Sequence, residues 1–256
     1  STVIGNMDTR QYSYTELADA INIHTGGIRS MLSIYGNQND RDKFYPKLSM
    51  TMKVLAPKLK DGAALMAEMI SSTHLEDKKR LKEIVGQLRS RIEMSMNGSG
   101  HLVAVNRTIS AQSMSAMYKE HIEGMDYYRF IERIEKNFDQ EADTIVSNLK
   151  DVANKVFKRE NLMFDLTCSD IDLEKMITPM IDVIEAVLPE AMMPYSEGLL
   201  ADDVKEALSY KMQAVKTEAY TTSGMVQYDA CAGDFIQAGY AYHGALNVLK
   251  VMMNYD

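Results

Sequence analysis

The sequence contains no tryptophan and only two cysteines, Cys168 and Cys231. The two cysteines lie far apart and match neither a CxxC redox pair nor the spacing of a zinc-ligand pair. This scarcity excludes a disulfide-stapled secreted scaffold, because such small domains need several bridges to compensate for a small core. We expect both thiols to be reduced and buried in a reducing compartment, and we predict a cytoplasmic location.

Long apolar runs and excess positive charge are also missing. No stretch approaches the ~20 residues that a membrane span needs, and no charged-then-apolar signal segment opens the chain. The formal net charge is −8 and the pI is near 5.2, which disfavours binding to a polyanion. The densest basic run, Lys78 to Lys82, is interpreted as the solvated start of a helix that also carries Glu76, Asp77 and Glu83. We therefore predict neither a nucleic-acid partner nor a membrane partner.

Hydrophobic residues are plentiful, at 46% of the 256 residues, and charged residues make up 25%. This composition is typical of a globular protein with a packed core. A chain of this length builds one principal domain plus an appendage, because domains usually run to roughly 100–200 residues. The 20 methionines are interpreted as core filler, since their flexible side chains fit irregular gaps.

The first fifty residues carry signals for a helix followed by a hairpin. Ser13 and Glu16 form a capping box, and Gly26-Gly27 supplies a stop, which predicts a helix from Tyr14 to His24. Apolar and polar residues then alternate from Leu48 to Val54, which is the period of a half-buried strand.

A weaker strand precedes this one, over Ile28 to Tyr35, and Gly36 to Asp42 would turn it back as a hairpin. From Asp61 onward the apolar period becomes helical, and Asn97 to Gly100 interrupts it. The predicted helices cover Leu65 to Ile70, Leu81 to Met96, His101 to Ile109, Met117 to Ile134 and Ala142 to Val156.

The last third contains mixed signals and the best linker candidate in the chain. Two prolines, a serine and a glycine without periodicity lie between Pro189 and Gly198, and we place a linker at residues 191–200. The other predicted elements are a strand at Leu162, Phe164 and Leu166, a helix capped by Ser169-Asp170 and kinked or restarted at Pro179, a strand from Val226 to Cys231, and a helical face made by Leu246, Leu249 and Met253.

Several motifs in fixed order resemble the presequence-protease and falcilysin branch of the insulinase (pitrilysin) family of zinc metallopeptidases. The similarity covers nearly the whole chain and lies in the region that follows the catalytic half. The stretches that carry it are Tyr14 to Leu17, Thr25 to Ile28, Asn97 to His101, Gly124 to Phe130, Thr222 to Tyr228, Gly239 to Leu246 and Asn254 to Asp256.

This resemblance implies the fold class and the domain organisation. We expect an α+β fold in which a layer of helices packs on a mainly antiparallel sheet, with helix in the majority. Residues 1–190 would form an incomplete third peptidase-like repeat, and residues 201–256 the opening strand and helix of a fourth repeat. Alternatively, residues 226–256 fold back and complete the first domain, because they are homologous to the strand and helix missing from its front.

The resemblance also implies zinc in the parent enzyme but not in this chain. The family binds zinc through His-x-x-Glu-His, in which Glu activates the water, plus a distant third carboxylate. None of the five histidines starts that pattern; they are His24, His74, His101, His121 and His243. We therefore predict no catalytic, metal or cofactor residues here, and the substrate-binding residues stay unassigned.

Three hypotheses for function remain open. In the first, the chain is an inert chamber-wall scaffold of a zinc-dependent peptidase that degrades short unfolded peptides, and its partner is the catalytic N-terminal half of the same polypeptide. In the second, it is a stand-alone peptide-binding or interaction module with a peptidase-like fold and no catalysis. The third is a helical scaffold unrelated to peptidases.

Two groups of residues invite a functional interpretation. Glu120, His121, Glu123 and Asp126 could be imagined as metal ligands, but their spacing matches no zinc motif, and we interpret them as an exposed charged helix face. Tyrosines could line a peptide chamber, although core or inter-repeat packing is the preferred interpretation. These tyrosines are Tyr12, Tyr14, Tyr127, Tyr128, Tyr240 and Tyr242.

Two further motifs receive no function. Gly98-Ser99-Gly100 lacks the pattern of a phosphate loop and is interpreted as a turn between two helices. Asn106-Arg107-Thr108 meets the glycosylation pattern but falls in a helical stretch of a protein predicted to be cytoplasmic.

Overall fold

The computed structural model describes residues 2–37, 40, 43–168, 177–178, 181–184, 186, 188, 217–221 and 225–254. Within these residues helices dominate, and the sheet is a two-stranded antiparallel ribbon of β1 (Ile28–Gly36) and β2 (Phe44–Met52). The predicted helix-rich α+β class is therefore confirmed. The helices are α1 (Tyr14–His24), η1 (Ala56–Lys58), α2 (Leu59–Ser71), α3 (Lys78–Gly98), α4 (Gly100–Ser110), α5 (Met114–Glu123), α6 (Met125–Val156), η2 (Arg159–Asn161) and α9 (Ala245–Asn254).

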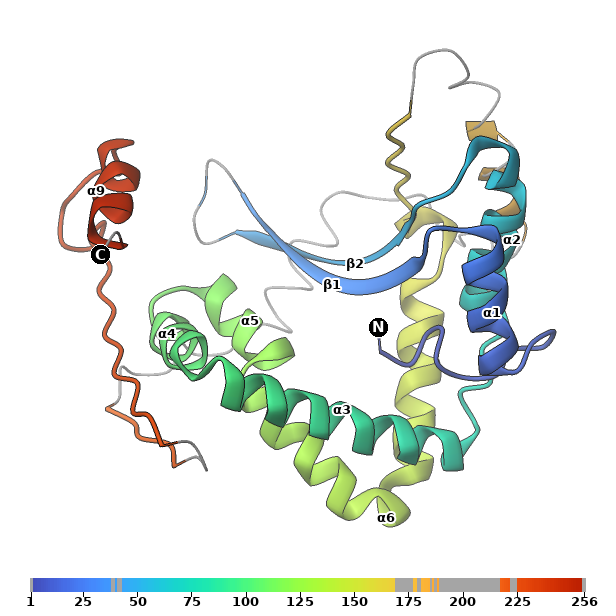
Figure 1. Cartoon of the computed structure of the whole chain (residues 1–256), viewed down its shortest axis with the longest axis horizontal. Coiled ribbons are helices and arrows are strands. Elements are labelled where there is room, and N and C mark those ends of the chain that lie inside the picture. Colours follow the sequence, from blue (N-terminus) through green and yellow to red (C-terminus); the bar gives the residue numbers. More distant parts are fainter. Residues whose placement is uncertain are drawn as a thin grey trace.

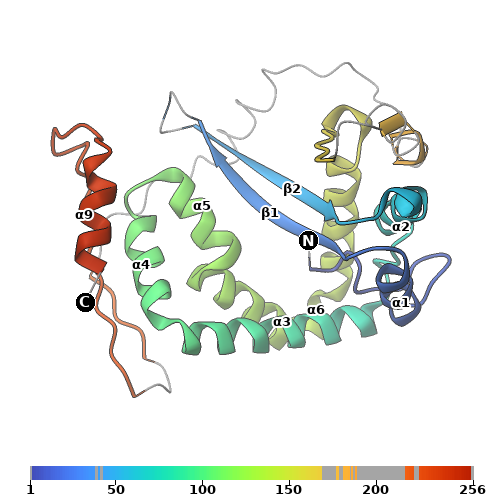
Figure 2. The same ribbon diagram turned by 45° about the horizontal axis from the view of Figure 1, so that its top comes forward.

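The elements form an open ring in Figures 1 and 2. The β1–β2 ribbon arches from α1 and α2 toward α5, and α3 and α6 run side by side along the opposite side. The ring of Phe44, in β2, lies 5.5 Å from that of Tyr118, in α5, which joins the far end of the ribbon to the helices. The ribbon is thus held at both ends.

Helix α1 begins with the predicted capping box. The Ser13 hydroxyl accepts a hydrogen bond from the Glu16 backbone nitrogen at 3.3 Å, and the Glu16 carboxylate accepts one from the Ser13 nitrogen at 2.9 Å. The Ser13 backbone hydrogen bond lowers the pKa of Glu16. After the helix, Gly27 has φ +117°, a conformation that L side chains rarely adopt.

The predicted hairpin is confirmed, with shifted ends. Ile28 pairs with Met52 and Leu32 with Leu48. The second strand starts earlier than its alternating pattern, at Phe44, and leaves the ladder after Met52. Val54 instead packs in a cluster beside α2, so its apolar character reflects packing against helices.

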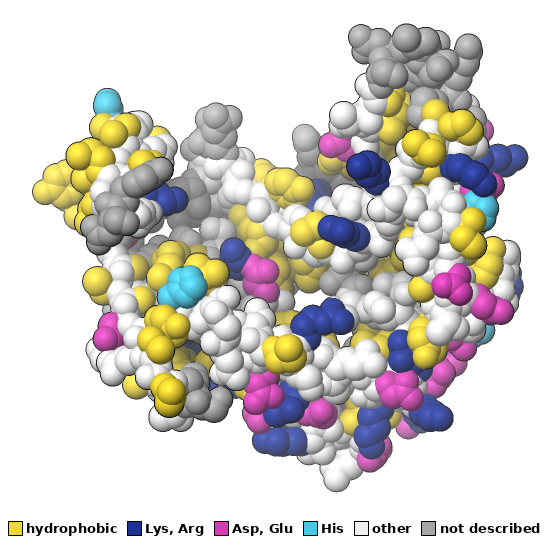
Figure 3. All heavy atoms as spheres, in the orientation of Figure 1, with side chains coloured by type: hydrophobic (Ala, Val, Ile, Leu, Met, Phe, Trp, Pro, Cys, Tyr) yellow, Lys and Arg dark blue, Asp and Glu magenta, His cyan; other side chains and the backbone are white. Residues whose placement is uncertain are grey.

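Helices α3 and α6 form the main helical layer. Their shared core contains Leu81, Ile84, Ile134 and Phe138, and Met7 from the N-terminal segment completes it. Lysines at the start of α3 face solvent and pair with carboxylates of α6, with Lys78 at 2.6 Å from Asp143. The expected solvated start of a helix is thus confirmed for the lysines, whereas the Arg80 side chain is only 12% exposed, and Figure 3 shows the mixed charges along this side.

Helix α6 differs from the prediction at its start and in its interior, whereas the predicted end at Val156 is confirmed. We expected one helix from Met117 to Ile134 and another from Ala142, but the break falls at Gly124 and the second helix is continuous to Val156. At 1.5 Å per residue, α6 is about 48 Å long. The apolar period continues through Phe138, which is buried against α3, so the polar residues around it only face solvent.

The predicted strand at Leu162, Phe164 and Leu166 is wrong, although its alternation is real. Residues 162–168 are extended and alternate between exposed and half-buried, yet they belong to no ladder in the described part of the chain. Leu162 and Phe164 pack against a buried cluster that contains Leu59 and Ala63 of α2. The alternation therefore records one apolar face laid on a helix, not a hydrogen-bonded strand.

The C-terminal part is the least packed. Residues 226–234 form no strand, which corrects the prediction for Val226 to Cys231, and α9 confirms the predicted helix but buries no residue. Cys231 is exposed, contrary to the expected burial, while both cysteines are free. Completion of the first domain by residues 226–256 stays a prediction. The linker at 191–200 and most of the helix after Ser169-Asp170 lie outside the described residues, and the domain division stays a prediction.

Candidate functional site

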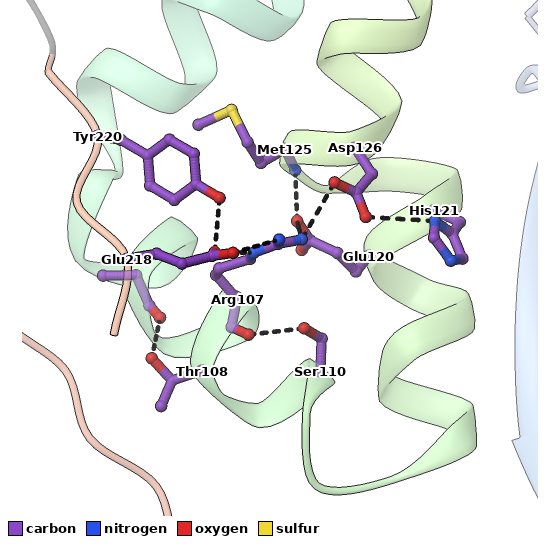
Figure 4. Close-up of polar contacts among 10 residues, drawn as sticks. Arg107, Thr108, Ser110, Glu120, His121, Met125, Asp126, Glu218 and Tyr220 are labelled. Atoms are coloured by element: carbon purple, nitrogen blue, oxygen red, sulfur yellow. Dashed lines mark hydrogen bonds and ion pairs between the residues drawn. The ribbon is translucent and has the colours of Figure 1, made fainter. Parts of the chain in front are cut away.

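A buried polar cluster centres on Arg107 of α4 and joins four segments (Figure 4). Its Nη1 lies 3.2 Å from Glu120 of α5 and 3.1 Å from Asp126 of α6. Its Nε and Nη2 donate to Glu218 at 2.7 and 3.1 Å, and the Tyr220 hydroxyl donates to the same carboxylate at 2.7 Å. One guanidinium thus ties α4, α5 and α6 to residues 217–221.

Local sequence places these groups. Ser113 caps α5 by accepting a hydrogen bond from the Ala116 nitrogen, which sets Glu120 in the last turn of that helix. The chain then breaks at Gly124, and Oε1 of Glu120 accepts a hydrogen bond from the Met125 nitrogen at 2.9 Å. Glu120 therefore satisfies a backbone donor at the N-terminus of α6, where negative charge is favoured.

Gly124 is required by this arrangement. A Cβ atom at this position would overlap the carboxylate of Glu120. The glycine is also the N-cap residue of α6 and has no side chain that could supply its own cap. The motif Gly124 to Phe130, which carries part of the family resemblance, is thus a helix start built around a neighbouring helix's carboxylate.

Electrostatics keep Arg107 charged. The hydrogen bond from Arg107 to Glu218 is the largest cause that raises its pKa, followed by Asp126, Tyr220 and Glu120, while burial opposes it. Burial, and then the hydrogen bond to Glu218, raise the pKa of Tyr220. Each carboxylate is used to balance a buried cation, which is how a folded chain offsets the cost of desolvating a charge.

The interpretation of Glu120, His121, Glu123 and Asp126 as an exposed charged face is wrong for Glu120, and also for His121 and Asp126, whose side chains are only 28% and 22% exposed. Glu120 is only 3% exposed, whereas the Glu123 side chain is 55% exposed. His121 lies 3.4 Å from Asp126 on the same cluster. In the described residues, no group of three or more His, Cys, Asp and Glu side chains is arranged to hold a metal ion.

Sequence reasoning missed the central residue. Arg107 was assigned no function, yet it is the one Lys, Arg, Asp or Glu residue in helix α4, Gly100–Ser110. An isolated arginine in such a helix indicates a buried partner, because an unpaired buried charge is costly. The partner Glu218 is 111 positions away along the chain, so sequence spacing could not have found it.

The tyrosines are divided between packing and exposure. Tyr12 packs on the core of α1 and α2, and burial raises the pKa of Tyr127, which hydrogen-bonds with Thr2. Tyr14 lies under Arg80, with 3.8 Å between the guanidinium carbon and the ring centroid. Tyr240 and Tyr242 are exposed, which contradicts a packing role for them within the described residues.

Two further features lie beside the cluster. Gly98-Ser99-Gly100 forms the predicted turn between α3 and α4. A groove of about 240 Å³ runs between α4 and α5, and it is lined by Asn106, Ile109, Ala116, Lys119, Glu120, Glu123 and Gly124. Its charged residues are already paired, with Lys119 at 3.3 Å from Glu123.

The sequence model of one family, described as peptidase M16 (subfamily C) associated, matches residues 1–134, just over half of the chain. The chain belongs to this family. The resemblance to the presequence-protease branch of the M16 metallopeptidases is thereby confirmed, and the match includes α1, the β1–β2 ribbon, Arg107 and the start of α6.

Full-length relatives are much longer than this family member. Protein HypA of Clostridium perfringens is 30% identical over 254 residues, covering 99% of this chain and 25% of the relative. Presequence protease 1, chloroplastic/mitochondrial, of Arabidopsis thaliana is 26% identical over 247 residues, covering 95% and 22%. The mitochondrial presequence protease of Drosophila melanogaster is 28% identical over 162 residues, covering 62% and 15%. The chain thus spans about a quarter or less of these relatives.

The described helices include no candidate for a membrane span. Among the residues it describes, no helix combines the length and the apolar character that crossing a lipid bilayer demands.

Proposed function

We propose that this family member is a non-catalytic wall segment of a zinc-dependent metallopeptidase that degrades short unfolded peptides. The match to the family model of the peptidase-associated region is the observation that carries the proposal. Two of the most similar relatives are named presequence proteases, and peptide cleavage and zinc are inferred from that kinship. Cytoplasmic location remains our prediction and rests on the two free thiols.

The residues that the structure describes do not fit a zinc site. The histidines lie apart, with His24 beside Asp61 and His121 beside Asp126 in separate regions, and the latter carboxylate also pairs with Arg107. We therefore assign zinc, and the water that it activates, to the remaining part of the polypeptide. This chain would form part of the chamber wall, and no catalytic step is assigned to its residues.

Exposed apolar surface on this chain supports a scaffold role in which the chain packs against another part of the polypeptide. On α9, Val248, Val251, Met252 and Met253 are all more than half exposed, and Figure 3 shows apolar side chains gathered there. The β1–β2 ribbon exposes a second set, Met31, Leu32, Tyr35 and Tyr45. Such surface usually marks an interface. We propose the catalytic half of the same polypeptide as its partner.

Reconstitution tests this proposal. The purified chain is mixed with the remaining three-quarters of the Clostridium perfringens relative, expressed without the quarter that aligns here. We expect a stable complex by size-exclusion chromatography and slower hydrogen exchange in α9 and β1. No complex, with exchange unchanged in both elements, would contradict the proposal.

A stand-alone peptide-binding module is the second candidate, and the same exposed apolar surface favours it. Titration of a fluorescent unfolded peptide of about twenty residues separates the two. Saturable binding to the isolated chain would favour the module, whereas binding only to the reconstituted complex supports the wall segment.

A further inference from the structure

The described C-terminal residues, 217–221 and 225–254, contact the helical body through a small set of polar and aromatic contacts; we call them the segment. Glu218 accepts two hydrogen bonds from Arg107, and the Arg129 guanidinium lies 5.1 Å from the Tyr220 ring centroid. The Tyr228 ring lies 5.8 Å from that of His101 at the start of α4. We call this set the clasp: Glu218, Tyr220 and Tyr228 on the segment, and His101, Arg107 and Arg129 on the body.

Apolar packing contributes little to this attachment. No described hydrophobic residue between 217 and 254 is buried, and none belongs to the three core clusters of the body. In Figures 1 and 2, α9 lies on the same side of the molecule as α4 and apart from α1 and α2. Segments with few buried apolar contacts open at low free energy, because little surface is newly exposed when they leave.

The body keeps its charge balance without the segment. If Glu218 leaves, Nη1 of Arg107 still contacts Glu120 and Asp126, so the guanidinium is not left as an uncompensated buried charge. Glu120 also keeps its hydrogen bond from the Met125 nitrogen. The contacts that hold α4, α5 and α6 together are thus separate from those that hold the segment.

We propose that the clasp is a reversible latch, which releases residues 217–221 and 225–254 while the helical body stays folded. Its central ion pair is partly open to water, with side-chain exposures of 13% for Arg107 and 30% for Glu218. Salt screens a partly buried pair less than an exposed one, but at 1 M ionic strength the Debye length falls to about 3 Å, which is comparable to the 2.7 Å between Nε of Arg107 and the Glu218 carboxylate. The latch therefore opens with rising ionic strength. This inference goes beyond the proposed function and does not depend on it.

A distance measurement between spin labels tests the latch. One label is placed on the native exposed Cys231, the other on the exposed face of α3 through Ser90→Cys, and Cys168→Ser removes the other thiol. We expect one narrow distance distribution at low salt. In 1 M salt, the fraction outside that distance should rise several-fold.

Glu218→Gln is the matched disruption, and Glu123→Gln, in the exposed pair with Lys119, is its control. We expect Glu218→Gln to broaden the distribution at low salt, and Glu123→Gln to leave it narrow. Circular dichroism should show the same helix content in all variants. A distribution that is broad in the parent at low salt, or unchanged by both 1 M salt and Glu218→Gln, would overturn the proposal. If Glu218→Gln fails to fold, the salt series on the parent alone decides.

Discussion

The Tyr228 ring lies so close to Gly100 that a Cβ atom on this glycine would come within 2.7 Å of two ring carbons. Gly100 is the first residue of α4, and Gly98, two residues earlier, has open space around the same position. One glycine is thus needed for contact with the C-terminal segment, whereas the other is not.

Gly100→Ala should therefore loosen the C-terminal segment without harming the body. We expect hydrogen exchange in residues 225–234 to become several-fold faster, because the Tyr228 ring must move away. The thermal midpoint of the body should stay close to that of the parent, since alanine favours helix over glycine by up to ~1 kcal/mol. Gly98→Ala serves as the control and should leave exchange in 225–234 unchanged. Equal effects from both substitutions would contradict the contact.

Glu120→Gln should destabilise the helical body. The substitution removes the charge that balances Arg107 and weakens the cap of α6, and Asp126 compensates only in part. We expect a loss of about 2–3 kcal/mol in the free energy of unfolding, measured by urea denaturation. Glu123→Gln, which breaks an exposed pair, should cost less than about 0.5 kcal/mol. Similar costs for the two variants would show that Glu120 is not a buried anchor.

Phe138→Ala should be among the most damaging substitutions in α6. Its ring is buried between α3 and α6, so truncation leaves a cavity and costs about 3–5 kcal/mol. Val152→Ala, at an exposed position of the same helix, should change stability by less than about 0.5 kcal/mol. Urea denaturation of both variants provides the comparison, and a small cost at Phe138 would contradict the packing of this layer.

Acid should remove the contribution of the α1 capping box. Hydrogen bonds from Ser13 lower the pKa of Glu16 below its ordinary 4.5 in the folded chain. A depressed folded pKa contributes stability above the unfolded value and loses it as the pH falls through the folded pKa. The difference in thermal midpoint between the parent and Glu16→Gln should therefore shrink below about pH 4.5. A difference that stays constant to pH 2 would argue against the charged cap.

Local signals in the sequence predicted local structure well. The Ser13–Glu16 box predicted the start of α1, and the alternation from Leu48 to Val54 indicated the ribbon, because each signal concerns residues close in the chain. The same alternation at Leu162 and Phe164 misled the strand prediction, since one-sided burial on a helix and in a sheet produce the same pattern. Only the position of the neighbouring element distinguishes them.

The candidate site depended on long-range contacts and was largely missed. Glu120 was interpreted as part of an exposed charged helix face because the spacing of the group matches no zinc motif, whereas its burial follows from Arg107 on another helix. Glu218 reaches the cluster from the last quarter of the chain. The family motif at Gly124 was recognised by resemblance, whereas its physical reason, the space for the Glu120 carboxylate, required coordinates.

We propose that this chain is itself non-catalytic. Incubation of the purified chain with short unfolded peptides, with and without added zinc, tests it most directly, together with metal analysis of the purified protein. We predict no cleavage above the rate without protein and no stoichiometric zinc. Zinc-dependent turnover that survives repurification would contradict the account, because it would require a metal site formed by residues of this chain.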